Sequence, residues 1–143
     1  MERLALAQLQ KWKQQKEHLP LLIRGARQVG KTWLLREHAK DYQQFIEINL
    51  ESDPEYIPLF KAYFGKPDQL LHAIELLSGK KLVAGHGLLF IDEIQQSKEA
   101  LLSLRYFKEK LSQLHVVAAG SLLEFAFSEF SFPVGRIEFM HLF

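Results

Sequence analysis

The chain has 143 residues, of which 48% are hydrophobic, and its 18 basic and 17 acidic residues give a formal net charge of +1. These values predict one globular domain with a real core, and they exclude a bulk electric field that would draw the chain to nucleic acid or to a membrane surface. The absence of cysteine excludes disulfides, thiolate zinc sites and thiol catalysis, and no apolar run is long enough to span a membrane. We therefore expect a cytoplasmic protein.

The first predicted element is an amphipathic helix over residues 4 to about 18. Its apolar residues recur at near-helical spacing and are Leu4, Leu6, Leu9 and Trp12. Lysines on this helix could touch a phosphate backbone, although a solvated helix face is the commoner explanation. Pro20 stops the helix, and the short apolar run at residues 19–24 predicts the first strand of the core.

The segment that follows fits the phosphate-binding pattern G-x-x-x-x-G-K-[ST] at every fixed position. It consists of Gly25, Ala26, Arg27, Gln28, Val29, Gly30, Lys31 and Thr32. In such a loop the backbone N–H groups surround a phosphate chain, Lys31 adds a full positive charge, and the hydroxyl of Thr32 binds magnesium. Residues 33–40 are rich in helix formers, so the loop has the strand before it and the helix after it that the motif requires. The alternative is a glycine loop that merely turns a strand into a helix.

Residues 45–50 alternate apolar and polar side chains and predict a second strand. Two helical stretches follow, over residues 55–64 and 67–77, with a break at residues 65–67. Pro67 suits the first position of the second stretch.

Residues 88–93 form an unbroken apolar run that ends in two carboxylates, Asp92 and Glu93. This pattern is typical of a buried parallel strand whose carboxyl end faces a site. In a phosphate-loop protein Asp92 would hold magnesium together with Thr32, and Glu93 would polarise the attacking water. Taken alone, such a pair is often only the cap of a following helix.

A helix is predicted over residues 98–111 with Ser97 as its cap, and a further strand over residues 115–119. Two interpretations of Ser121 remain open. It could sense the γ-phosphate from the tip of a strand beside the phosphate loop, or it could form a capping box with Glu124. The six histidines show no ligand spacing, so we expect them to be structural or solvated.

The last part of the chain is dense in phenylalanine: Phe125, Phe127, Phe130, Phe132, Phe139 and Phe143. Such aromatic density needs a surface to pack on, and a homo-oligomer or a missing C-terminal domain would supply one. Residues 137–143 resemble a strand. We expect the chain to be the front part of a longer protein, the alternative being a natural C-terminal strand that completes the sheet.

Four segments together resemble the AAA-type domain of a prokaryotic ATPase family whose members usually carry a C-terminal domain of unknown function. They are residues 25–32, 90–95, 119–121 and 133–136. The Arg-Gln-Val within the loop and the glutamine after the Asp-Glu pair, Gln95, are finer marks of the family than the generic phosphate loop. The sequence departs from the family pattern by ending just before the second domain.

The resemblance implies an α/β P-loop NTPase fold, a parallel sheet of about five strands flanked by helices with strand order 5-1-4-3-2. In that order the Ser121 strand separates the Asp92 strand from the phosphate-loop strand. Residues 1–143 would then be a single domain, with residues 1–18 as an N-terminal helix and residues 19–143 as the core. The resemblance also favours ATP as the nucleotide and makes Arg136 the candidate for stabilising transition-state charge, in its own site or a neighbour's. The alternative is that Arg136 lies on the surface or forms an ion pair and has no catalytic role.

The sequence thus predicts magnesium-dependent ATP binding and hydrolysis, with Lys31, Glu93 and Arg136 as the catalytic residues. A second hypothesis is a nucleotide-gated interaction module that binds ATP with negligible turnover. A phosphoryl-transferring kinase is less favoured because no acceptor site or lid with paired arginines is visible.

Overall fold

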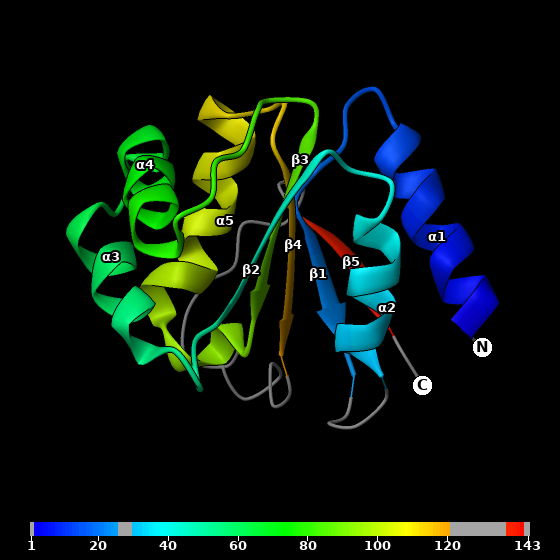
Figure 1. Ribbon diagram of the computed structural model, residues 1–143, viewed down its shortest axis with the longest axis horizontal. Helices are drawn as coiled ribbons and strands as arrows, with labels where there is room; N and C mark the ends of the chain where they lie inside the picture. The colour runs from blue at the N-terminus through cyan, green and yellow to red at the C-terminus, as the bar shows by residue number, and fades with distance from the viewer. Residues whose placement is uncertain (1, 26–29, 121–136, 142–143) are drawn as a thin grey trace.

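The computed structural model describes residues 2–25, 30–120 and 137–141, and these form a parallel sheet between two layers of helices (Figure 1). The strands are β1 (Leu21–Arg24), β2 (Gln44–Asn49), β3 (Gly87–Asp92), β4 (His115–Gly120) and β5 (Glu138–His141). They pair in the order β2-β3-β4-β1-β5, and every pair is parallel. This confirms the expected order 5-1-4-3-2, read from the opposite edge.

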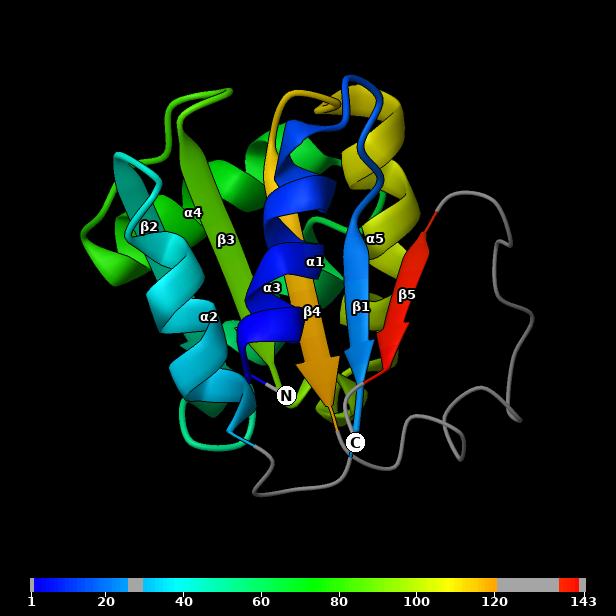
Figure 2. The same ribbon diagram turned by 90° about the vertical axis from the view of Figure 1, so that its right-hand side faces the viewer.

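Two helices cover one face of the sheet and three cover the other (Figures 1 and 2). The first layer holds α1 (Glu2–Gln14) and α2 (Lys31–Ala39), and the second holds α3 (Ile57–Ala62), α4 (Pro67–Ser78) and α5 (Lys98–Lys110). Two short 3-10 turns, η1 (Pro54–Tyr56) and η2 (Ile94–Gln96), precede α3 and α5. Parallel strands need such helical crossovers, so both faces of the sheet are covered.

Strand β3 pairs with β2 on one side and β4 on the other, and all six of its residues are buried. Successive side chains of a strand point to opposite faces. Accordingly Leu88 and Phe90 pack in the cluster below α1 and α2, whereas Leu89 and Ile91 pack in the cluster below the other three helices. The unbroken apolar run of the sequence is therefore what a strand covered on both sides requires.

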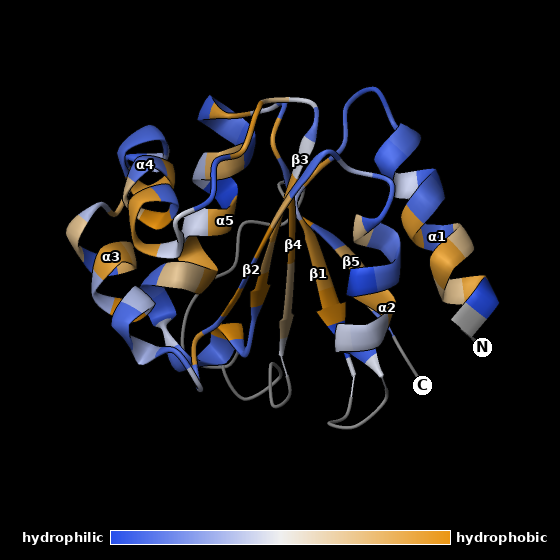
Figure 3. Ribbon diagram, in the orientation of Figure 1, coloured by the Kyte–Doolittle hydropathy of each residue, from blue (hydrophilic) through white to orange (hydrophobic). Residues whose placement is uncertain are grey.

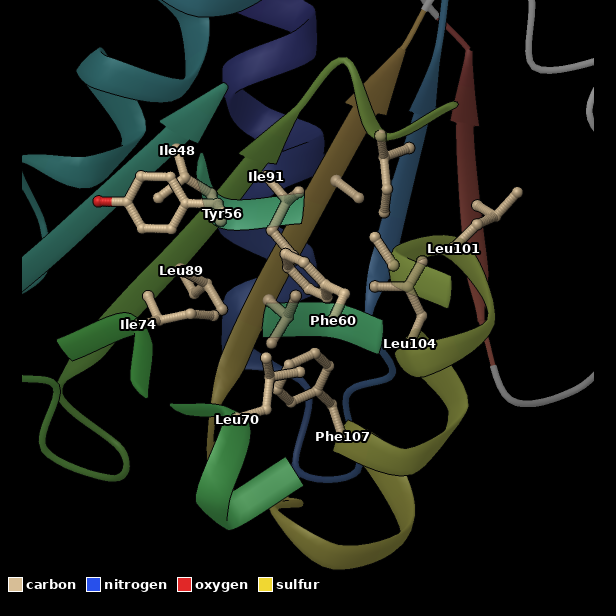
Figure 4. Close-up of a cluster of buried hydrophobic side chains, with 14 of the residues drawn as sticks. Ile48, Tyr56, Phe60, Leu70, Ile74, Leu89, Ile91, Leu101, Leu104 and Phe107 are labelled. Carbon is tan, nitrogen blue, oxygen red and sulfur yellow. The ribbon is translucent and has the colours of Figure 1, made fainter. Parts of the chain in front are cut away.

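The larger of the two clusters is shown in Figure 4. Phe60 from α3 and Phe107 from α5 gather there with Leu104 over the face of the sheet that carries Leu89 and Ile91. The outward sides of the helices are largely hydrophilic, while the strands between them are hydrophobic (Figure 3). Within the described ranges, no helix has the length and apolar character needed to cross a bilayer.

Two predicted helices have different bounds in the structure. The helix expected over residues 55–64 is divided into η1 and the shorter α3, which carries Pro58 in its first turn. Proline lacks an N–H and is accepted only near the start of a helix, so a new helical start falls there. Helix α1 ends at Gln14 instead of near His18, and the His18 ring reaches across to the carbonyl of Leu114 over 3.1 Å.

Candidate active site

The phosphate-binding segment connects β1 to α2 at the carboxyl end of the sheet. Gly30 caps α2 with φ 76° and ψ 21°, and its carbonyl accepts a hydrogen bond from the N–H of Leu34 over 3.0 Å. This left-handed conformation is costly for a residue with a Cβ, which explains a glycine here. Gly25 follows β1 directly, while Ala26, Arg27, Gln28 and Val29 lie outside the described residues.

Lys31 begins α2 and reaches the carboxylates at the end of β3. Its Nζ lies 3.5 Å from Asp92 Oδ1 and 4.0 Å from Glu93 Oε1. The residue is only 8% exposed, and Nζ has no hydrogen-bond partner among the described residues. A buried ammonium without hydrogen bonds is unfavourable on its own, so this one is suited to an incoming anion.

Thr32 and Asp92 meet on the same side of the site, as the sequence predicts. Thr32 Oγ1 donates to Asp92 Oδ2 over a long 3.4 Å, and the other carboxylate oxygen accepts from the backbone N–H of Glu93 over 2.8 Å. Neighbouring ligands of an octahedral magnesium ion, each at 2.0–2.1 Å, lie about 3 Å apart. Thr32 Oγ1 and Asp92 Oδ2 are therefore close enough together to bind one ion.

Glu93 turns back toward the site by an unusual backbone conformation. Its φ of 51° and ψ of 47° are left-handed, and among the described residues it is the only non-glycine with positive φ. Its side chain is nearly buried and accepts a hydrogen bond from Gln95 Nε2 over 3.0 Å. In the sequence Gln95 is notable only as a mark of the family, because no spacing rule shows that its amide returns to Glu93.

Two predicted site residues, Ser121 and Arg136, lie outside the described residues. Strand β4, which ends at Gly120, lies between β1 and β3, with Gly120 in register with Arg24. The separation of the phosphate-loop strand from the Asp92 strand by one intervening strand is thereby confirmed.

This combination of fold and site defines a P-loop nucleotide-binding domain. A family model described as an AAA domain matches residues 17–143, which is most of the chain. The chain belongs to this AAA domain family. No curated protein matches it.

A solved structure of similar fold is consistent with this assignment. The Walker-type ATPase paby2304 of Pyrococcus abyssi is similar to the chain with a TM-score of 0.60 and 20% identity. The match covers 100% of this chain and 54% of that one, so the chain spans about half of the ATPase's length. PCH-2 of C. elegans gives a TM-score of 0.47 at 12% identity, over 98% of this chain and 41% of that one.

Proposed function

We propose that the chain binds ATP with magnesium and hydrolyses it by in-line attack of water on the γ-phosphate. The observation that carries the proposal is the buried Lys31 ammonium, which has no hydrogen bond among the described residues and lies beside two carboxylates at the carboxyl end of the sheet. The family membership supports nucleotide binding, and a Walker-type ATPase shares the fold.

In this proposal residues 25–32 bind the phosphates, because loop amides and the start of α2 favour negative charge. Lys31 binds the β- and γ-phosphates. Thr32 and Asp92 hold magnesium, which when bound neutralises charge on the β- and γ-oxygens. Glu93 orients the attacking water and accepts its proton, and Ser121 and Arg136 complete the site as a γ-phosphate sensor and a stabiliser of transition-state charge.

The nucleotide changes the charge balance around Lys31. Before binding, the cation lies between two carboxylates, and their attraction offsets part of the cost of burying it. Phosphates that enter the loop compete for the same ammonium, so the attraction between Lys31 and Glu93 weakens. A less tightly paired carboxylate is the state in which Glu93 can accept a proton from water.

The test is phosphate release from ATP by the wild type and by Glu93→Gln, with magnesium and with a chelator. We expect magnesium-dependent release by the wild type and a loss of about 100-fold or more in Glu93→Gln, which is the lower limit typical of losing a general base. Glu55→Gln, at an exposed position in η1, is the matched control. Equal rates in the wild type and Glu93→Gln would remove Glu93 from catalysis, and tight ATP binding without release would favour the interaction module instead.

A further inference from the structure

Glu93 has a neutral partner as well as a cationic one. Its Oε1 accepts the hydrogen bond from Gln95 Nε2 at 3.0 Å, and Lys31 Nζ lies 4.0 Å from the same oxygen. In the proposed function Lys31 is engaged by phosphate, whereas an uncharged amide is not drawn away by the nucleotide's charge. Gln95 is thus a partner that can remain with Glu93 throughout the reaction.

The backbone brings Gln95 to this position. The left-handed conformation at Glu93 is followed at once by the 3-10 turn η2, which closes with a hydrogen bond from the N–H of Gln96 to the carbonyl of Glu93 over 3.1 Å. Such a conformation in a residue with a side chain persists only where the surroundings fix it, and these conformations cluster at functional sites. Here it places an amide beside the carboxylate two residues before it.

The turn that carries Gln95 is anchored at both ends. Ile94 is fully buried in the larger hydrophobic cluster. Ser97 caps α5, since its side chain accepts a hydrogen bond from the N–H of Ala100 over 3.0 Å. The backbone on both sides of Gln95 is therefore held in place. A residue that orients another side chain needs such support.

The amide group itself is oriented by Glu93. Gln95 Oε1 is buried and has no hydrogen-bond partner among the described residues, so in that part of the chain the amide is held through its nitrogen. The hydrogen bond to a carboxylate is of the charge-assisted, stronger kind. Gln95 is half-buried, whereas the next residue, Gln96, is exposed to solvent.

We propose that Gln95 is a positioning residue that keeps the Glu93 carboxylate directed at the attacking water after the nucleotide has engaged Lys31. This inference rests on the proposed function. Gln95 acts through Glu93, so its loss slows the chemical step and leaves nucleotide affinity unchanged.

The experiment measures kcat for ATP hydrolysis and the dissociation constant for ATP in the wild type, in Gln95→Met and in Gln96→Met. Methionine keeps the length of glutamine and removes the donor. Gln95→Met is expected to lower kcat about tenfold, which corresponds to about 1.4 kcal/mol, with the dissociation constant unchanged within about twofold. Gln96→Met, at the exposed neighbour, is expected to leave both values unchanged.

A double-mutant cycle with Glu93→Gln separates positioning from a structural role. Once the carboxylate is gone, Gln95→Met should change the residual rate less than about twofold. An equal loss of rate in both backgrounds would overturn the inference, as would weaker ATP binding by Gln95→Met.

Two further results keep the test decisive. If Gln95→Met does not fold, Gln95→Leu replaces it, because it also removes the donor and adds no charge beside Glu93. Hydrolysis by the wild type with no loss in either Gln95 variant would overturn the inference and leave the proposed function standing. Absence of hydrolysis by the wild type would overturn both.

Discussion

At the scale of single residues, the site depends on backbone conformations as much as on charges. Gly30 at the start of α2 and Gly79 at the end of α4 both have left-handed φ, 76° and 73°, and a Cβ at either would meet no atom of the described residues within 4 Å. Backbone strain therefore opposes substitution at both positions, with no crowding from that part of the chain.

This pair gives a matched prediction. Gly30→Ala and Gly79→Ala should each lower the free energy of unfolding by about 1 kcal/mol, measured by urea denaturation. Only Gly30→Ala should also weaken ATP binding, because only this glycine shapes the phosphate loop. Equal ATP affinity in the two variants would argue against the loop conformation as the basis of binding.

The sequence predicts which side chains of the site meet at one edge of the sheet better than it predicts how they are oriented there. Lys31, Thr32, Asp92 and Glu93 converge as expected, because the motif and the end of a buried strand both determine which edge of the sheet they occupy. The contact between Gln95 and Glu93 could not be predicted, since it depends on a left-handed residue that is not glycine.

At the scale of elements, the C-terminal ends of α1 and α2 meet the start of β4, and aromatic and histidine rings cluster there. The His18 and His115 rings are stacked with centroids 3.9 Å apart, and Trp12 lies edge-on to His115 at 5.3 Å. His38 and Tyr42 join this cluster. The sequence gives no sign of it because its members lie up to about a hundred residues apart, and among the described residues no group of such side chains is arranged to hold a metal ion.

Burial gives this cluster a pH dependence. It lowers the pKa of His38 to about 4, with Lys13 adding to the effect and Asp41 opposing it. Burial also lowers the pKa of His115 to about 4, helped by His18, Lys13 and His38, while the hydrogen bond to the carbonyl of Lys13 opposes the shift. Both histidines therefore take up protons more readily in the unfolded chain than in the folded protein.

This difference in proton binding sets the direction in which stability changes with pH. Stability is fully present above the unfolded pKa of about 6.5 and is lost as the pH falls toward about 4. At pH 5 each histidine should lower the free energy of unfolding by up to about 2 kcal/mol relative to pH 7. Urea denaturation of the wild type, of His38→Phe and of the exposed control His72→Gln tests this. Of the two variants, only His38→Phe should reduce the change in the free energy of unfolding between pH 7 and pH 5. The same change in His38→Phe as in the wild type would contradict this prediction.

The bounds of elements were harder to predict than their existence. All five strands were expected, because parallel core strands show continuous or alternating apolar residues. The early end of α1 at Gln14 was not expected. After it the chain brings His18 to the carbonyl of Leu114, a contact between residues 96 positions apart that no local pattern predicts.

At the scale of the whole molecule, α1 belongs to the folded unit although the AAA family model begins at residue 17. Ala5, Leu9 and Trp12 are buried against the sheet together with α2, and the indole N–H of Trp12 donates to the carbonyl of Leu19 over 2.7 Å. In Figure 2 the beginning of α1 lies near the same edge as the carboxyl ends of the strands. Helix α1 therefore supports the layer that holds α2 and Lys31.

The two tryptophans test this role of α1. Trp12 is 1% exposed and Trp33 is 48% exposed. Trp12→Ala should lower the free energy of unfolding by about 3–5 kcal/mol, whereas Trp33→Ala should lower it by less than about 1 kcal/mol. Small losses in both variants would show that α1 is not part of the cooperative core.

The most direct test of the central claim is a calorimetric titration of the protein with ATP and magnesium, comparing the wild type, Lys31→Met and the exposed control Lys61→Met. We expect binding by the wild type and the control, and at least about 100-fold weaker binding by Lys31→Met, because a lost charged contact of about 3 kcal/mol has that effect. Binding of equal strength in all three proteins, or no binding by the wild type, would contradict this claim.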